Sequence, residues 1–145
     1  MPSSLAKPPH RPVYHVRYSA PMIPAVAFAA VSALLVAFQL ALALGARWGA
    51  FAWGGQHAER LPTGYRIGSA ASIVLHAFLT TIVLDRGGVV ALYPAGFSGV
   101  AVWVVFGFLA LGIVMNALSR SRRERAVMTP VAAVLTGLAL LVALL

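Results

Sequence analysis

The chain has 145 residues, of which 61% are hydrophobic and only 10% are charged. In a soluble domain, roughly a quarter of all residues are charged, so lipid rather than water is expected to cover much of this protein. The sequence contains no cysteine, which excludes disulfide frameworks, thiolate metal sites and thiol redox chemistry.

The formal net charge of +8 would suggest nucleic acid as the partner of a soluble protein. Here the Lys and Arg residues stand in short stretches beside apolar runs, where such residues set membrane topology and contact anionic headgroups. We therefore expect a lipid bilayer with anionic headgroups as the partner, and no nucleic acid.

Residues 1–23 are predicted to form a disordered, basic, proline-rich tail. Its prolines remove backbone donors and fix φ, and its basic residues repel one another. No packed element is expected before the first apolar run.

Four apolar runs predict membrane-spanning helices over about residues 24–45, 67–84, 97–118 and 128–145. As a helix, the first run rises about 33 Å, enough to cross a hydrocarbon core of about 30 Å. A basic tail before an apolar run also resembles a signal peptide, but this run is longer than the usual signal core. The predicted fold class is an all-α, four-helix transmembrane bundle with up-down topology.

The start of the fourth span is the least regular boundary. Thr129 and Pro130 match an N-cap residue followed by proline at the first helical position. A helix from Pro130 to Leu145 rises only about 24 Å, so this helix begins earlier, thins the bilayer locally or stands upright.

Counting Lys and Arg predicts the orientation of a multi-pass protein in the cell membrane. The tail and the second loop share one side, which carries Lys7, Arg11, Arg17 and Arg86. The first and third loops share the other side, which carries Arg47, Arg60, Arg66, Arg120, Arg122, Arg123 and Arg125. The positive-inside rule places these two loops in the cytoplasm and both termini outside, although translocation of a basic tail works against it.

The first span carries alanine at every fourth position, which gives a candidate helix-packing ridge of Ala25, Ala29, Ala33, Ala37 and Ala41. Small side chains on neighbouring turns let another helix approach closely, within the bundle or between protomers. The alternative is that alanine is simply abundant in this span.

The second span carries a candidate polar path along one face, formed by Arg66, Ser69, Ser72, His76 and Thr80. An ionisable residue near the bilayer midplane, as His76 is, suggests function, here a water-lined or proton-carrying path. The alternative is a neutral His76 bonded to a neighbouring helix, with the hydroxyls bonded to carbonyls of their own helix.

Two further amides, Gln39 and Asn116, are expected near the membrane face that carries the first and third loops. They could bond to one another and fix the helix register, or line a shallow polar vestibule at that face.

The first and third loops are the remaining candidates. Trp48, Phe51 and Trp53 in the first loop suit anchoring at the headgroup level, and the loop could also cap a vestibule or seat a headgroup. The third loop offers candidate contacts to anionic lipid or phosphate, namely Arg120, Arg122, Arg123 and Arg125.

No catalytic constellation is predicted. The three acidic residues Glu59, Asp85 and Glu124 all fall near the interfaces, and the sequence has no phosphate-binding loop or metal-ligand spacing. We expect no enzyme, no catalytic, cofactor-binding or metal residues, and no cofactor.

Several short strings resemble the uncharacterised small four-span integral membrane proteins of high-GC, actinobacterial-type bacteria. They are Trp48-Gly49, Trp53-Gly54-Gly55, Leu61-Pro62, Arg66, Ser69, Asn116 to Ser121, Glu124-Arg125 and Met128-Thr129-Pro130. The resemblance covers about residues 24–145 and implies the four-span architecture without supplying a site. The chain lacks the first-helix glutamate of small multidrug transporters and the pattern of fluoride channels.

Two functions remain open from the sequence. The first is a non-enzymatic bundle that packs with itself as a homo-oligomer or with a larger membrane complex. The second is a small transporter or channel that uses the polar stripe on the second span.

Overall fold

A computed structural model of the protein describes residues 20–145, and all their regular elements are helical. The four long helices are α1 (Met22–Leu44), α2 (Thr63–Arg86), α3 (Phe97–Ala117) and α4 (Arg122–Leu144), and two short 3-10 helices, η1 (Gly49–Phe51) and η2 (Trp53–Gly55), lie between α1 and α2. Each long helix is long and apolar enough to cross a membrane. The predicted all-α, four-helix membrane fold is confirmed, while most of the predicted tail, residues 1–19, lies outside the described residues.

The helices extend to or beyond the predicted spans at most ends. α1 and α3 end within a residue of the predictions, whereas α2 extends beyond residues 67–84 at both ends. Hydropathy marks the part of a helix that lies in hydrocarbon, and a helix continues past it through interfacial polar residues such as Arg66 and Asp85.

The start of α4 differs from the prediction. The helix begins at Arg122, before the predicted start at residue 128, and Pro130 lies inside it. Ser121 is the N-cap, because its Oγ accepts a hydrogen bond from the backbone N–H of Glu124 at 3.3 Å. Of the three ways considered for this span to cross the bilayer, the structure supports the earlier start.

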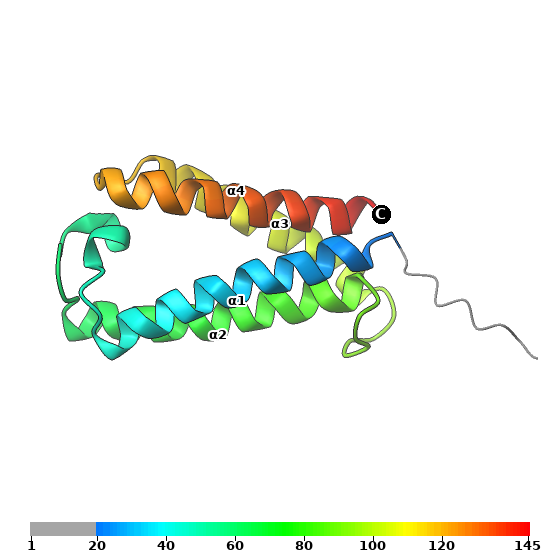
Figure 1. The fold of residues 1–145 in the computed structure, drawn as a ribbon. Coiled ribbons are helices and arrows are strands. Elements are labelled where there is room, and N and C mark those ends of the chain that lie inside the picture. The colour runs from blue at the N-terminus through cyan, green and yellow to red at the C-terminus, as the bar shows by residue number, and fades with distance from the viewer. Residues whose placement is uncertain (1–19) are drawn as a thin grey trace, which may run out of the picture.

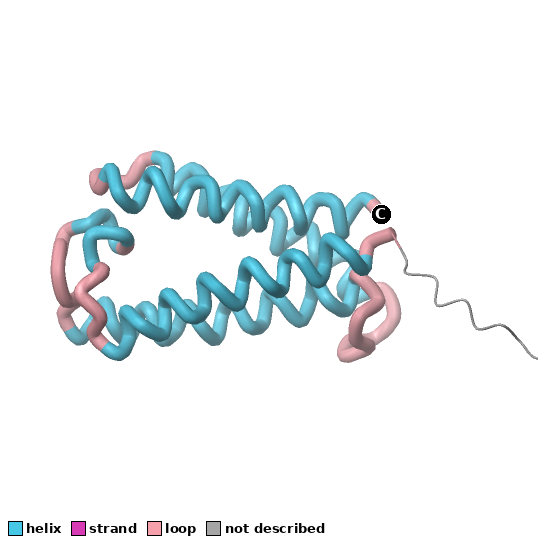
Figure 2. The backbone as a smooth tube through the Cα atoms, in the orientation of Figure 1, coloured by secondary structure: helices cyan, strands magenta, loops and turns pink. Residues whose placement is uncertain are grey.

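The bundle consists of two antiparallel hairpins. α1 packs mainly on α2, and α3 packs mainly on α4, with fewer contacts between the two hairpins. Figure 1 shows the hairpins close together at the end that carries the α2–α3 loop and the C-terminus, and apart at the opposite end. Figure 2 shows that the segment between α1 and α2, called loop 1 below (residues 45–62), occupies that opposite end between the hairpins.

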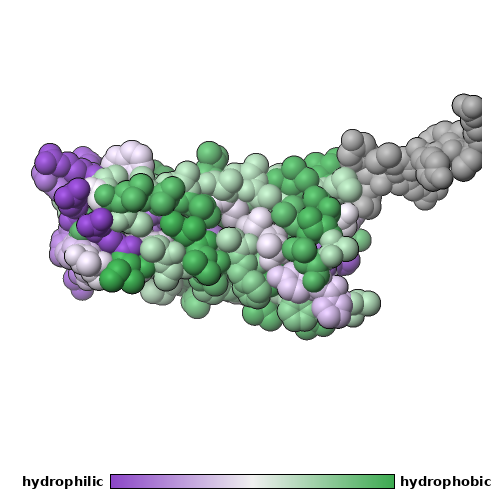
Figure 3. Space-filling model, turned by 90° about the horizontal axis from the view of Figure 1, so that it is seen from below, coloured by the Kyte–Doolittle hydropathy of each residue, from purple (hydrophilic) through white to green (hydrophobic). Residues whose placement is uncertain are grey.

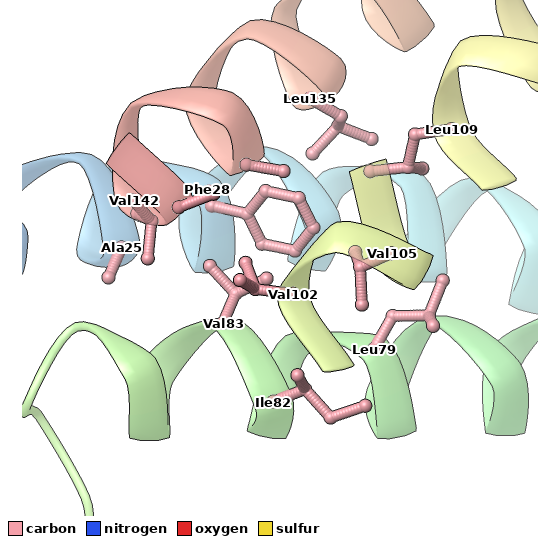
Figure 4. Packing of buried hydrophobic residues seen from close by; sticks show 12 residues of the cluster. Ala25, Phe28, Leu79, Ile82, Val83, Val102, Val105, Leu109, Leu135 and Val142 are labelled. Carbon is pink, nitrogen blue, oxygen red and sulfur yellow. The ribbon is translucent and has the colours of Figure 1, made fainter. Parts of the chain in front are cut away.

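An apolar core joins the hairpins where they converge. Phe28 of α1 is completely buried among Val83 of α2, Val102 of α3 and Val142 of α4 (Figure 4). The core continues towards the middle of the bundle as far as Leu109 and Leu135. Burial of these side chains excludes both water and lipid from this half of the bundle.

The outer surface is divided along its length. Figure 3 shows hydrophilic residues gathered at the end that carries loop 1 and the α3–α4 loop, with a mostly hydrophobic surface beyond it. Large apolar side chains such as Leu34, Val74, Val104 and Leu141 are exposed along all four helices. Lipid contact explains this exposure, because such a surface would not be stable in water.

On the alanine ridge of α1, substitution by leucine is expected to destabilise the protein at buried positions and not at exposed ones. Ala25 is completely buried, and a Cβ added at Gly87, the C-cap of α2, would overlap its Cβ. Ala25→Leu should therefore overpack this contact and lower the free energy of unfolding by about 1–3 kcal/mol, measured by denaturation with SDS in mixed micelles.

The matched control is Ala33→Leu, because Ala33 belongs to the same ridge but is exposed. It should leave the free energy of unfolding unchanged within about 0.5 kcal/mol. Equal destabilisation by both substitutions would contradict the packing described here.

Candidate functional site

A cavity of about 750 Å³ lies between the two hairpins where they diverge. All four long helices contribute to its walls, and loop 1 lies across its end. Most of the lining is apolar, including Leu35, Phe38, Phe108, Leu109 and Leu135. The cavity therefore lies within the part of the bundle that lipid surrounds.

The cavity is blind. Its lining extends along α4 from Glu124 at the loop end to Leu135, a rise of about 16 Å, or roughly half the thickness of the hydrocarbon core. Leu109 and Leu135 belong both to the cavity wall and to the apolar core. The core therefore closes the cavity near the level of the bilayer midplane.

Several polar side chains line the cavity, among them Gln39 of α1, His76 of α2 and Asn116 of α3. Gln39 and Asn116 thus meet in one vestibule, but no hydrogen bond joins them among the described residues. The Oε1 atom of Gln39 and the Nδ1 atom of His76 are both buried without a hydrogen-bond partner.

The other polar atom of these two side chains, Nε2, is not buried in this way and makes no hydrogen bond within residues 20–145. Gln39 and His76 therefore both line the cavity and both keep one buried polar atom without a partner. A buried polar atom without a partner costs about 1–3 kcal/mol, so these two atoms lower the stability of the bundle.

A nearby polar pair provides the contrast. The Thr80 hydroxyl of α2 donates to the backbone oxygen of His76 at 2.7 Å and accepts from the hydroxyl of the buried Ser32 of α1 at 3.0 Å. This pair links α1 to α2 with its polar atoms satisfied.

Removal of the polar atoms of Gln39 and of Thr80 is expected to change the free energy of unfolding in opposite directions. Gln39→Leu removes an unpaired buried oxygen and should raise the free energy of unfolding by about 1 kcal/mol, whereas Thr80→Val leaves Ser32 without its partner and should lower it by about 1 kcal/mol. Denaturation in mixed micelles measures both. A loss of stability in Gln39→Leu would show that the amide has a stabilising partner.

Loop 1 forms a lid that is hydrogen-bonded to both hairpins. Trp53 of η2 donates from its Nε1 to Ser69 of α2 at 3.3 Å, and the backbone N–H of Gly54 donates to the carboxylate of Glu124 in α4 at 2.8 Å. Ser121 donates to the backbone oxygen of Ala50. The lid therefore links the hairpins at the end where their helices diverge.

The lid takes this path through an unusual backbone turn. Trp53, Gly54 and Gly55 have φ angles of 55°, 74° and 67°, in the left-handed region that side chains with a Cβ disfavour. A Cβ at Gly55 would overlap the side chain of Ser121, so glycine also permits the close approach of the lid to the start of α4.

Glu124 is the residue on which these contacts converge. Its side chain is only 7% exposed, and besides Gly54 it accepts a hydrogen bond from the Oγ of Ser119. It also lies in the first turn of α4, where the helix dipole stabilises a negative charge. The sequence did not lead us to expect a structural role for Glu124, although Ser121-Arg122-Arg123-Glu124 matches the capping-box spacing.

Removal of the Glu124 carboxylate is expected to release the lid. In Glu124→Ala, the Gly54 N–H and the Ser119 hydroxyl lose their acceptor, at a cost of about 1–3 kcal/mol. Because the protein has no cysteine, a single Ala52→Cys reports on the lid. Ala52 is 7% exposed, and labelling of Cys at this position by a maleimide should become about tenfold faster in the Glu124→Ala background.

Glu59→Ala is the matched control, since Glu59 is exposed and its side chain makes no hydrogen bond within the described residues. It should not change the labelling rate. Equal rates in Glu124→Ala and the parent protein would show that Glu124 does not hold the lid.

The five residues of the predicted polar path are not all brought to the cavity. Only His76 lines it. Arg66 donates to the backbone oxygen of Ala43 at the end of α1, while Ser69 accepts from Trp53 and Ser72 donates to the backbone oxygen of Gly68. With Thr80 bonded to Ser32, most of this stripe serves the packing of α2 against α1 and the lid.

The predicted packing ridge is divided between the inside and the outside of the bundle. Ala25 is buried, Ala29 and Ala41 are half-buried, and Ala33 and Ala37 are exposed.

The predicted anionic contacts lie in the α3–α4 loop and the first turn of α4. Arg120, Arg122, Arg123 and Arg125 are all exposed, and Arg125 donates to the backbone oxygen of Ser119 at 2.9 Å. Arg120 is the one member of this group that lines the cavity.

Within residues 20–145, no three His, Asp or Glu side chains gather in a way that could hold a metal ion. No protein-family model, curated protein or solved structure matches the chain. The resemblance to four-span proteins of high-GC bacteria therefore stays a prediction, and the function is argued from the geometry of the cavity.

Proposed function

We propose that the protein is a non-enzymatic membrane protein that binds an amphipathic molecule from the bilayer in the cavity between its hairpins. The observation that carries this proposal is the blind cavity of about 750 Å³ inside the lipid-surrounded part of the bundle. Sites for small molecules usually measure about 300–1,000 Å³ and combine apolar walls with a few polar groups. The apolar lining and the polar side chains of Gln39, His76 and Asn116 fit this description.

The closed inner end favours binding over conduction. A transporter or channel would need a path that continues past Leu109 and Leu135, where the four helices instead form the apolar core. The hydroxyls of the polar stripe are already bonded to α1, to the lid or to their own helix. These contacts make the stripe a weaker basis for a function than the cavity.

Self-association is a second candidate function, and the exposed Ala33 and Ala37 of α1 favour it. Small side chains on a lipid-facing surface allow a second helix to approach closely. If Ala33→Leu keeps its stability but loses an oligomer in native mass spectrometry, this face is an interface between copies. If the oligomeric state is unchanged, the face only contacts lipid.

The positive-inside rule supports a cytoplasmic location for loop 1 and the α3–α4 loop. Both loops lie at the open end of the hairpins (Figure 1), so the cavity belongs to the cytoplasmic leaflet in this proposal.

Filling the cavity tests the binding proposal. Gly112 lines the cavity, and a Cβ added there meets no other atom within 4 Å. Gly112→Leu should therefore fold normally and occupy the space of the ligand. Gly107→Leu is the matched control on α3, because it also meets no atom within 4 Å but does not line the cavity.

The fluorescence of Trp53, which lines the cavity, reports on binding. With Trp48 and Trp103 replaced by Phe, a brominated long-chain fatty acid should quench Trp53 saturably in the parent and in Gly107→Leu. In Gly112→Leu, the apparent affinity for the brominated fatty acid should be lower by at least about tenfold. Absence of saturable quenching in the parent, or equal quenching in both glycine variants, would refute the proposal.

A further inference from the structure

The cavity wall has two charged residues, which differ in exposure. They are Arg120 and Glu124, and the buried Glu124 carboxylate accepts hydrogen bonds from Gly54 and Ser119 on its Oε2 atom. Arg120 is exposed and makes no hydrogen bond or ion pair within residues 20–145. At the loop end of the cavity, the positive charge of Arg120 is therefore exposed, whereas the negative charge of Glu124 is buried and only 7% exposed.

The neutral polar groups add hydrogen-bond donors to this charge. Asn116 lies about one helical turn before Arg120 in the chain and lines the same wall. Gln39 of α1 adds a second amide to the lining. A ligand whose polar group accepts hydrogen bonds and carries negative charge can use both the guanidinium of Arg120 and these amides.

The depth of these groups matches the way in which a lipid lies in a bilayer. Arg120 stands in the α3–α4 loop, at the hydrophilic end of the molecule (Figure 3), which corresponds to the headgroup level. The walls become apolar towards Leu35, Phe108 and Leu135, about 16 Å deeper and near the midplane. An amphipath in the surrounding leaflet has its charge and its chain at these same depths, so it can enter the cavity without moving along the membrane normal.

We propose that the ligand is an anionic amphipath, whose headgroup oxygens contact Arg120 and Asn116 while its hydrocarbon chain lies along the apolar walls. This inference rests on the proposed function, since it specifies the ligand of the same cavity. A free fatty acid and an anionic phospholipid share this chemistry. A cationic amphipath is disfavoured because its headgroup would lie against the exposed Arg120, while the Glu124 carboxylate is buried and already holds two donors.

Three dodecyl probes of matched chain length test the choice of headgroup: dodecanoate, methyl dodecanoate and dodecyltrimethylammonium. Each probe displaces the brominated fatty acid from the protein that keeps only Trp53, in nanodiscs of zwitterionic lipid. Dodecanoate should bind roughly three- to tenfold more tightly than methyl dodecanoate, the effect of one charge-assisted hydrogen bond at a partly exposed site. Dodecyltrimethylammonium should bind most weakly.

Arg120→Gln should remove the difference between dodecanoate and its methyl ester. Arg123→Gln is the matched control, because Arg123 is exposed in the first turn of α4 and does not line the cavity. It should preserve the difference. Native mass spectrometry of the protein with dodecanoate or with phosphatidylglycerol then distinguishes a fatty acid from a phospholipid by the mass that is bound.

The outcomes separate the two proposals. If the cationic probe binds as tightly as dodecanoate, or if Arg120→Gln and Arg123→Gln weaken dodecanoate equally, the inference about headgroup charge is wrong. If all three probes bind equally and Gly112→Leu still blocks them, the proposed function holds without this selectivity. If none of the probes binds saturably, the proposed function itself is refuted.

Discussion

The contact between the carboxylate of Glu124 and loop 1 is the interaction on which the open half of the bundle depends. At one end, four helices meet in an apolar core around Phe28. At the other end, the hairpins diverge (Figure 1), and the hydrogen bonds from Gly54 to Glu124 and from Ser121 to Ala50 connect the lid to the start of α4. A buried carboxylate is tolerated there because it has two donors and lies in the first turn of a helix. The same residue thus fixes the start of α4 and closes the cavity.

Some polar side chains inside the bundle are hydrogen-bonded, and others keep an atom without a partner. Ser32 and Thr80 bond to one another across the α1–α2 contact, which is the usual requirement for polar atoms away from water. Gln39 and His76, by contrast, keep polar atoms unpaired, and both line the cavity. Arg86 and Thr129 also keep a buried polar atom unpaired, and neither lines the cavity, so the binding role is argued from the volume and lining of the cavity and not from unpaired atoms alone.

The sequence predicted the architecture because hydropathy and length decide whether a helix crosses a membrane. It also placed Gln39 and Asn116 at one membrane face, and a loop over a vestibule was among the alternatives for the first loop. For the start of α4, the sequence left an earlier start as one of three alternatives, because Thr129-Pro130 also matches a helix start. The structure shows the earlier start, with Ser121 as the N-cap. The cavity itself was not predictable, because it follows from the angle between the hairpins, and no local pattern encodes that angle.

The divergence of the hairpins has a consequence for the mechanics of the surrounding bilayer. A bundle whose helices spread towards one face occupies more area in that leaflet than in the opposite one, and so has a wedge-like cross-section. Lateral pressure in the wider leaflet acts to bring the hairpins together, and a molecule between them resists that compression. If the cavity binds a ligand as proposed, its occupancy is coupled to the packing stress of one leaflet, and a membrane that relieves this stress through curvature favours the divergence of the hairpins.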